Sequence, residues 1–95
     1  MKEITSSATV DLTGYRNVTD LLVHRLAVAP NHAAFDVPIA NGSAWRTVTT
    51  AEFAEDVMAT ARGLIAAGVE PGESVAIMAQ TRYEWAVCDL AVWYA

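Results

Sequence analysis

Residues 49–79, TTAEFAEDVMATARGLIAAGVEPGESVAIMA, decide the fold because they contain a helix start, a helix end, a turn and a strand in succession. Thr49 and Glu52 have the spacing of a capping box, in which each side chain binds the backbone N–H of the other residue. This start predicts a long helix with one apolar stripe at helical spacing. The stripe consists of Phe53, Val57, Ala61, Leu64, Ile65 and Gly68.

Glycines divide this stretch into its elements. Gly68 occupies the position after the helix where a left-handed residue is favoured, and Pro71-Gly72 predicts a turn. Gly63 lies within the helix, where we expect it to allow close packing. The apolar run 74–79 follows the turn and predicts a strand that is buried on both faces, as in a parallel sheet.

The residues before this stretch predict a helix and a hairpin. Asn17 is a favourable helix cap, and a helix is expected over about 17–28. Residues 33–37 and 45–48 are expected to pair around Asn41-Gly42, with Trp45 half-buried. Residues 1–16 are predicted to form a flexible lead-in with a possible short strand at 9–12.

The last residues predict a third helix. Thr81 and Glu84 repeat the capping-box spacing, and the helix that follows is apolar nearly all round, which is typical of a helix buried inside a larger structure. Trp85 and Trp93 are eight residues apart and are expected on one face, either in the core or at an interface. No stop signal precedes Ala95, so we expect the chain to be part of a larger protein.

Composition excludes several classes of protein. The chain has 95 residues, of which 54% are hydrophobic, and a net charge of −5, so it is one domain at most and lacks a basic surface for nucleic acid. The single cysteine, Cys88, excludes an internal disulfide and a cysteine-based zinc site. No secretory signal or membrane-spanning run is present, and the expected location is cytoplasmic.

The sequence predicts no catalytic, cofactor-binding or metal-binding residue within the chain. His24 and His32 are eight residues apart and lack the spacing of a helical metal pair, so both are expected to be solvated. Three acids, Glu52, Glu55 and Asp56, are explained by the favourable N-terminal end of a helix. The glycines are not followed by the Lys-Ser/Thr of a phosphate loop. These residues indicate part of an α/β protein and name no reaction.

Three segments carry a resemblance to a known family. Residues 45–53 (WRTVTTAEF) resemble the hairpin-to-helix entry of adenylate-forming (AMP-binding) acyl-activating enzymes, and residues 68–77 (GVEPGESVAI) resemble their L-G-V-x-P-G-D-x-V-A-I stretch. Residues 81–91 (TRYEWAVCDLA) resemble the N-x-x-E-W-x-x-x-D-x-A helix of bacterial long-chain fatty acyl-CoA synthetases. The resemblance covers about 17–95. It implies that this α/β segment (helix, β-hairpin, long helix, buried strand, apolar helix) is the N-terminal part of the large domain of the acyl-CoA synthetase-like fold.

The resemblance also implies a reaction for the parent enzyme. Such ligases join a fatty acid to CoA through an acyl-adenylate, releasing pyrophosphate and then AMP, and they use ATP, Mg and CoA. Their phosphate loop, their Tyr-Gly-x-Thr-Glu motif, their ribose-binding aspartate and their C-terminal lysine are missing from residues 1–95. The segment alone is therefore expected to be inactive and to bind no cofactor.

The expected partner is the rest of the large domain. A homodimer, or an exchange of elements between two copies, is also expected to be possible through Trp85, Trp93 and the edge of the 74–79 strand. Two alternatives to a fatty acyl-CoA synthetase segment stay open at this point. One is a non-catalytic self-association module, and the other is a segment of another adenylating enzyme, such as a peptide-synthetase adenylation domain.

Overall fold

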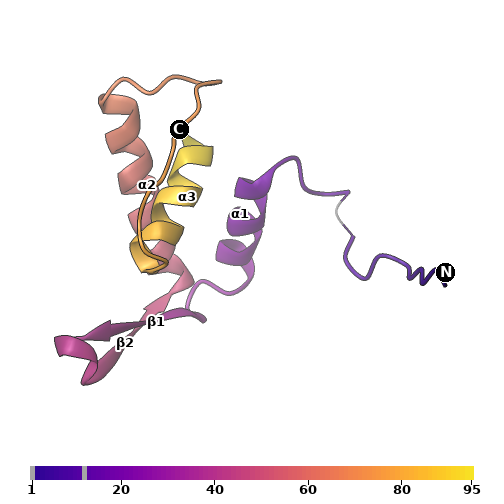
Figure 1. The fold of residues 1–95 in the computed structure, drawn as a ribbon, viewed down its shortest axis with the longest axis horizontal. Helices are drawn as coiled ribbons and strands as arrows, with labels where there is room; N and C mark the ends of the chain where they lie inside the picture. Colours follow the sequence, from indigo (N-terminus) through magenta and orange to yellow (C-terminus); the bar gives the residue numbers. More distant parts are fainter. Residues whose placement is uncertain (1, 12) are drawn as a thin grey trace.

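The computed structural model describes residues 2–11 and 13–95. The elements are α1 (Val18–Val28), β1 (Ala33–Ile39), the 3₁₀ turn η1 (Ala40–Gly42), β2 (Ala44–Thr49), α2 (Thr50–Ala66) and α3 (Tyr83–Tyr94). Helices α2 and α3 lie side by side, the hairpin lies at one end of the pair, and α1 lies next to α3 (Figure 1). The predicted α/β class, with three helices and one hairpin, is confirmed.

The first helix begins as predicted. Asn17 has an extended backbone, and its side-chain oxygen accepts a hydrogen bond from the N–H of Thr19 at 3.0 Å. Leu22 is the buried residue of α1, whereas Val18 and Leu21 are exposed, so only part of the apolar face is used. The prediction of a short strand at 9–12 is wrong for Thr9 and Val10, because both residues lie in a bend. Leu12 lies outside the described residues.

Strands β1 and β2 form the predicted antiparallel hairpin. Pairs run from Ala33 with Thr49 to Ile39 with Ala44, and a bulge at Ala34 shifts the register. The loop between the strands places Asn41 at φ 60° and ψ 26°, which confirms the predicted turn. The prediction for Trp45 is wrong: its side chain is 65% exposed, because in a two-stranded ribbon the outward face has no layer against it.

Helix α2 has well-satisfied ends. The Thr49–Glu52 capping box is present in both directions, and the N–H groups of Thr50 and Ala51 donate to the carbonyls of His32 and Pro30. The backbone that leads into β1 thereby supplies acceptors for amides that a helix start otherwise leaves unpaired.

The C-terminal end of α2 is a Schellman motif. The N–H of Gly68 donates to the Ile65 carbonyl, the N–H of Val69 donates to the Leu64 carbonyl, and Gly68 has φ +104°. The predicted roles of Gly68 and Gly72 are confirmed, since both have positive φ. Gly63 is exposed, with no atom within 4 Å of the position of a Cβ, so its predicted packing role is wrong.

The predicted buried strand at 74–79 is absent from this structure. The segment is extended beside α2 and α3, but its backbone makes no hydrogen bond to the described residues, and Met78 is fully exposed. Val75 and Ile77 are half-buried, while Ser74, Ala76 and Met78 are exposed. This alternation is that of a strand, but a strand needs a neighbouring strand to pair with. The hairpin, which is the sheet of the described residues, does not pair with this segment.

The predicted capping box of α3 is also wrong. The residue that caps the helix is Arg82, and it makes no side-chain capping bond. The carboxylate of Glu84 instead binds the Arg82 guanidinium at 2.7 Å, so it does not reach the backbone N–H of Thr81. Trp85 and Trp93 are exposed, at 38% and 58%, so neither side chain belongs to the core of the described residues.

The core lies where the hairpin and the three helices α1, α2 and α3 meet. Its buried apolar side chains are Leu22, Val48, Phe53, Ala54, Val57, Ala61, Val87 and Ala91. From the predicted stripe of α2, Phe53, Val57 and Ala61 are buried and Leu64 is half-buried, but Ile65 is exposed because no described element covers its side of the helix.

Candidate functional site

An aromatic cluster joins the hairpin to both long helices. The rings of Phe35 and Phe53 lie 4.9 Å apart, and Tyr83 lies 5.3 Å from Phe35 and 6.0 Å from Phe53. The Tyr83 hydroxyl donates a 2.6 Å hydrogen bond to the Asp56 carboxylate. Burial, together with this hydrogen bond and the negative charge of Asp56, raises the pKa of Tyr83 well above its usual range. The phenol therefore acts as a structural donor.

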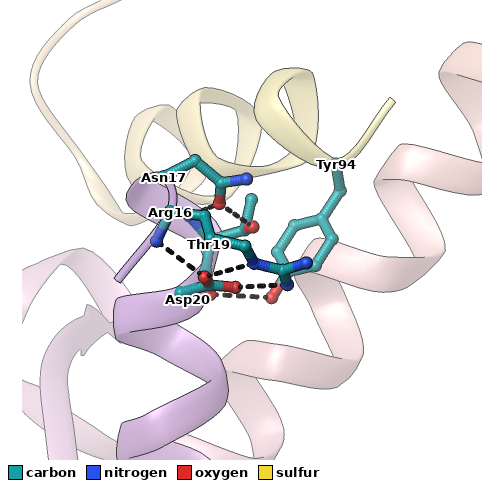
Figure 2. Close-up of polar contacts among 5 residues, drawn as sticks. All are labelled: Arg16, Asn17, Thr19, Asp20 and Tyr94. Atoms are coloured by element: carbon teal, nitrogen blue, oxygen red, sulfur yellow. Dashed lines mark hydrogen bonds and ion pairs between the residues drawn. The ribbon is translucent and has the colours of Figure 1, made fainter. Parts of the chain in front are cut away.

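A second polar group, which we call the α1–α3 clasp, consists of Arg16, Asn17, Thr19, Asp20 and Tyr94 (Figure 2). The Arg16 guanidinium binds both oxygens of Asp20, at 3.1 and 3.2 Å, and the N–H of Arg16 donates to the same carboxylate. The Asn17 oxygen also accepts a short hydrogen bond from the Thr19 hydroxyl. The Tyr94 hydroxyl donates to the Thr19 carbonyl at 3.3 Å, which joins the last turn of α3 to the first turn of α1.

The charges within the α1–α3 clasp balance one another. Hydrogen bonds from Arg16 hold the pKa of Asp20 below its usual value, and the same contact raises the pKa of Arg16. Partial burial raises the pKa of Tyr94, and the nearby Asp20 charge adds to this effect. Arg16 and Asp20 pair with each other at the start of α1, so they offer no free acid or base. The link from α1 to α3 is the hydrogen bond from Tyr94 to Thr19.

Two grooves lie at the ends of α3. The first has a volume of about 670 Å³ and lies between residues 69–75 and 92–95, with the exposed Trp93 on one wall. Its rim carries Glu70 and Glu73, and a Glu73 oxygen accepts a hydrogen bond from the Glu70 N–H at 3.0 Å. An acidic rim repels phosphate, so this groove does not suit a nucleotide.

The second groove, of about 590 Å³, lies between residues 35–38 and 80–86. Its wall is mostly apolar or aromatic, and its cation, Arg82, is already paired with Glu84. Neither groove brings a nucleophile next to a base. Both are mainly apolar surfaces, the first at the C-terminal end of α3 and the second at its N-terminal end.

The structure keeps apart the residues that sequence analysis weighed for chemistry. His24 is exposed and packs edge-on against Tyr15 at 5.9 Å, and His32 is exposed in the loop before β1, so both are solvated as predicted. Hydrogen bonds from Thr49 lower the pKa of Glu52. Among residues 2–11 and 13–95, no three His, Cys, Asp or Glu side chains gather in a way that could hold a metal ion.

Sequence reasoning missed both tyrosine links. Tyr83 and Asp56 are 27 residues apart, and Tyr94 and Thr19 are 75 apart, so no local spacing indicates either pair. For the described residues, no helix is both long enough and apolar enough to cross a membrane.

Residues 22–95 match the family described as AMP-binding enzyme. The chain belongs to this family. The matched region begins within α1 and includes the hairpin, α2, the 74–79 segment and α3. The family that the sequence resembles is thereby confirmed.

Two curated relatives give the same result. The chain is 35% identical over 92 residues to the long-chain-fatty-acid–CoA ligase FadD15 of Mycobacterium tuberculosis, and equally so to the protein of the same name from Mycobacterium bovis. Each alignment covers 97% of this chain but 15% of the relative, so the chain spans about one-seventh of the length of these enzymes. No solved structure matches the chain.

Proposed function

We propose that this chain is the N-terminal structural part of a fatty acyl-CoA synthetase. The whole protein would convert a fatty acid, ATP and CoA into acyl-CoA, AMP and pyrophosphate through an acyl-adenylate. Membership of the AMP-binding enzyme family and the 35% identity to a long-chain-fatty-acid–CoA ligase support this reaction and its substrate class. Residues outside 1–95 would hold ATP, Mg and CoA, and residues 17–95 would frame the cavities that those residues build.

The observation that carries this proposal is the mismatch between the surface and the mass of the chain. The accessible surface is 7465 Å², whereas a compact monomer of this mass has about 5,300 Å². The radius of gyration is 16.5 Å, whereas about 12 Å is typical of a compact domain of this length. Part of this excess comes from residues 2–11 and 13–16, which extend away from the helices (Figure 1), and part comes from exposed apolar side chains such as Ile65, Met78 and Trp93. Exposed apolar surface of the second kind is the property of a segment that packs against further parts of a domain.

The 74–79 segment is the place where this packing would be most specific. Val75 and Ile77 are already half-buried, while Ala76 and Met78 are exposed and the backbone makes no hydrogen bond to the described part of the chain. We propose that this segment becomes a strand of a larger sheet in the whole protein, with both faces covered. The order α2, strand, α3 is that of a layered α/β domain.

Activity and folding test the two parts of this proposal. The whole protein should catalyse ATP–pyrophosphate exchange with a long-chain fatty acid, and purified 1–95 should show none above background. Exchange by 1–95 itself would contradict the structural role. In the whole protein, Ile77→Asp should abolish soluble expression because an unpaired buried charge costs several kcal/mol. Ile4→Asp is the matched control, since Ile4 is almost fully exposed and precedes the matched region.

A second candidate function is self-association, which the free backbone at 74–79 and the exposed Trp93 favour. An open strand edge can template pairing with another copy. Light scattering of 1–95 across a concentration series tests this candidate. A mass that stays near 10.2 kDa rejects it, and a dimer that Trp93→Glu dissociates without unfolding supports it.

A further inference from the structure

The loop that joins β1 to β2 has an unusual backbone. Ala40, Asn41 and Gly42 have φ values of 49°, 60° and 83°, so three successive residues lie in the left-handed region. Two of them are not glycine, and alanine adopts this region at a cost. The Ser43 N–H and hydroxyl both donate to the Ala40 carbonyl, at 3.1 and 2.7 Å, and this contact closes the loop.

Asn41 and Gly42 form an Asn-Gly pair within this loop. Both residues are exposed, and the Asn41 carboxamide has no hydrogen-bond partner among the described residues. No atom lies within 4 Å of the position of a Cβ on Gly42. The backbone nitrogen of Gly42 therefore has no side chain of its own residue to shield it. It lies next to the Asn41 carboxamide, which no hydrogen bond to the described residues holds in place.

The other two asparagines provide internal comparisons. The oxygen of Asn17 caps α1 and accepts hydrogen bonds from both the N–H and the hydroxyl of Thr19, and the next residue is the β-branched Val18. Asn31 is followed by His32, whose N–H donates to the Ala29 carbonyl. At these two positions the following nitrogen is hindered by a side chain, and either the asparagine or that nitrogen is engaged in a hydrogen bond.

We propose that Asn41 is a modification site, at which the side chain deamidates spontaneously and the backbone is converted in part to isoaspartate. The Gly42 amide gives its proton to a solvent base, and its nitrogen attacks Cγ of Asn41. A C–N bond forms, the Cγ–Nδ2 bond breaks, and ammonia leaves from a cyclic imide. Water then opens the imide at either carbonyl, which yields aspartate or isoaspartate at position 41. The reaction consumes water, releases ammonia and needs no oxidant.

Because Asn41 lies at the tip of the hairpin, its modification should change the structure only near that tip. Isoaspartate adds a carbon to the main chain and a negative charge to the loop, so it should disturb the nearest pairs, Ile39 with Ala44 and Pro38 with Trp45. The core lies at the other end of the hairpin, around Phe35 and Val48. The modified chain should therefore stay folded, with a loosened hairpin tip. The chemical partner that fits the product is an enzyme that methylates isoaspartyl carboxylates.

Ageing of the purified 95-residue chain tests the proposal. The chain is incubated in mildly alkaline buffer, digested, and analysed by mass spectrometry and by methyl transfer from an isoaspartyl methyltransferase. We expect the peptide containing Asn41 to gain about one dalton, as an amide becomes a carboxyl group, and to accept methyl groups many-fold above the peptides with Asn17 and Asn31. The rate should rise with pH, because the attacking nitrogen must lose its proton.

Two controls make the outcome decisive. Asn41→Gly keeps a residue that tolerates positive φ and removes the carboxamide, so it should abolish methyl acceptance while the circular dichroism spectrum stays unchanged. A synthetic peptide of residues 38–44, PIANGSA, reports the rate without the fold. Equal labelling of the three asparagines would overturn the proposal. So would an unmodified Asn41 in the folded chain under conditions in which the free peptide has fully reacted.

Discussion

The hydrogen bond between Tyr83 and Asp56 gives the most direct test of how α2 and α3 are held together. Tyr83→Phe removes one hydroxyl and leaves the ring in its contacts with Phe35 and Phe53. A hydrogen bond to a charged group contributes about 1.5–3 kcal/mol, but Asp56 is exposed to solvent, which reduces the value, so we expect a loss of about 1 kcal/mol. For a domain of this size, that loss lowers Tm by about 4–8 °C.

The same pair predicts a dependence on pH. Since the folded state raises the pKa of Tyr83 above its unfolded value of 10.0, the folded chain holds this proton more tightly. Its contribution to stability is complete below about pH 10 and is lost as pH rises beyond that value, where the unfolded chain ionises first. Tyr94 has a raised pKa as well and adds a change of the same sign. Tyr83→Phe should flatten the alkaline part of the stability curve.

Urea denaturation of 1–95, followed by circular dichroism from pH 7 to pH 11, measures both effects. Tyr15→Phe is the matched control, because the ring of Tyr15 touches His24 but its hydroxyl makes no hydrogen bond to the described residues. If Tyr83→Phe leaves the free energy of unfolding unchanged at pH 7, the hydrogen bond does not join the helices. If it keeps the full alkaline slope, the assignment of that slope to Tyr83 is wrong.

Three further changes test the packing and the local geometry. Val57→Ala removes two methyl groups from a fully buried site, and the free energy of unfolding in urea should fall by about 2 kcal/mol. Thr49→Ala removes the cap of α2 and should cost about 1 kcal/mol, whereas Thr49→Ser should cost less because the hydroxyl remains. Ala40→Gly removes the strain of an alanine in the left-handed region, so it should stabilise the fold by up to about 1 kcal/mol and raise Tm. An unchanged or lower Tm would contradict the strain at this residue.

Several features of the fold could be predicted from local sequence signals, because the residues that form each of them lie close together in the sequence. The Thr49–Glu52 box, the Gly68 helix end and the Asn41-Gly42 loop all appear as predicted. In each case the hydrogen bonds join residues no more than five positions apart, so nothing distant is needed to form them. The same rule failed at α3, where Arg82 competes successfully for the Glu84 carboxylate. An adjacent cation is visible in the sequence, and it could have indicated this outcome.

The features that could not be predicted depend on contacts between residues far apart in the sequence. The sequence predicts that 74–79 is a strand, and its alternating burial agrees, but pairing requires a second strand that the described residues do not provide. The link from Tyr83 to Asp56 spans 27 positions and depends on how the hairpin, α2 and α3 close around Phe53. For the candidate site, the sequence predicts only that this segment lacks catalytic residues, and that stays a prediction. The polar contacts that hold the helices together could not be predicted, because their partners lie far apart in the sequence.

Helix α3 shows why the exposed apolar surface follows from the sequence. A helix that is apolar nearly all round cannot bury every side against one neighbour, and here Val87 and Ala91 face the core while Trp93 and the groove beside it remain open. Had the helix evolved only for this contact with α2, polar residues on its outer side would have been favoured by solvation. The apolar outer side of α3 and the free backbone of 74–79 lie next to each other, so a single covering layer would satisfy both. This joint requirement is what links the local structure of the chain to the larger acyl-activating domain that we propose.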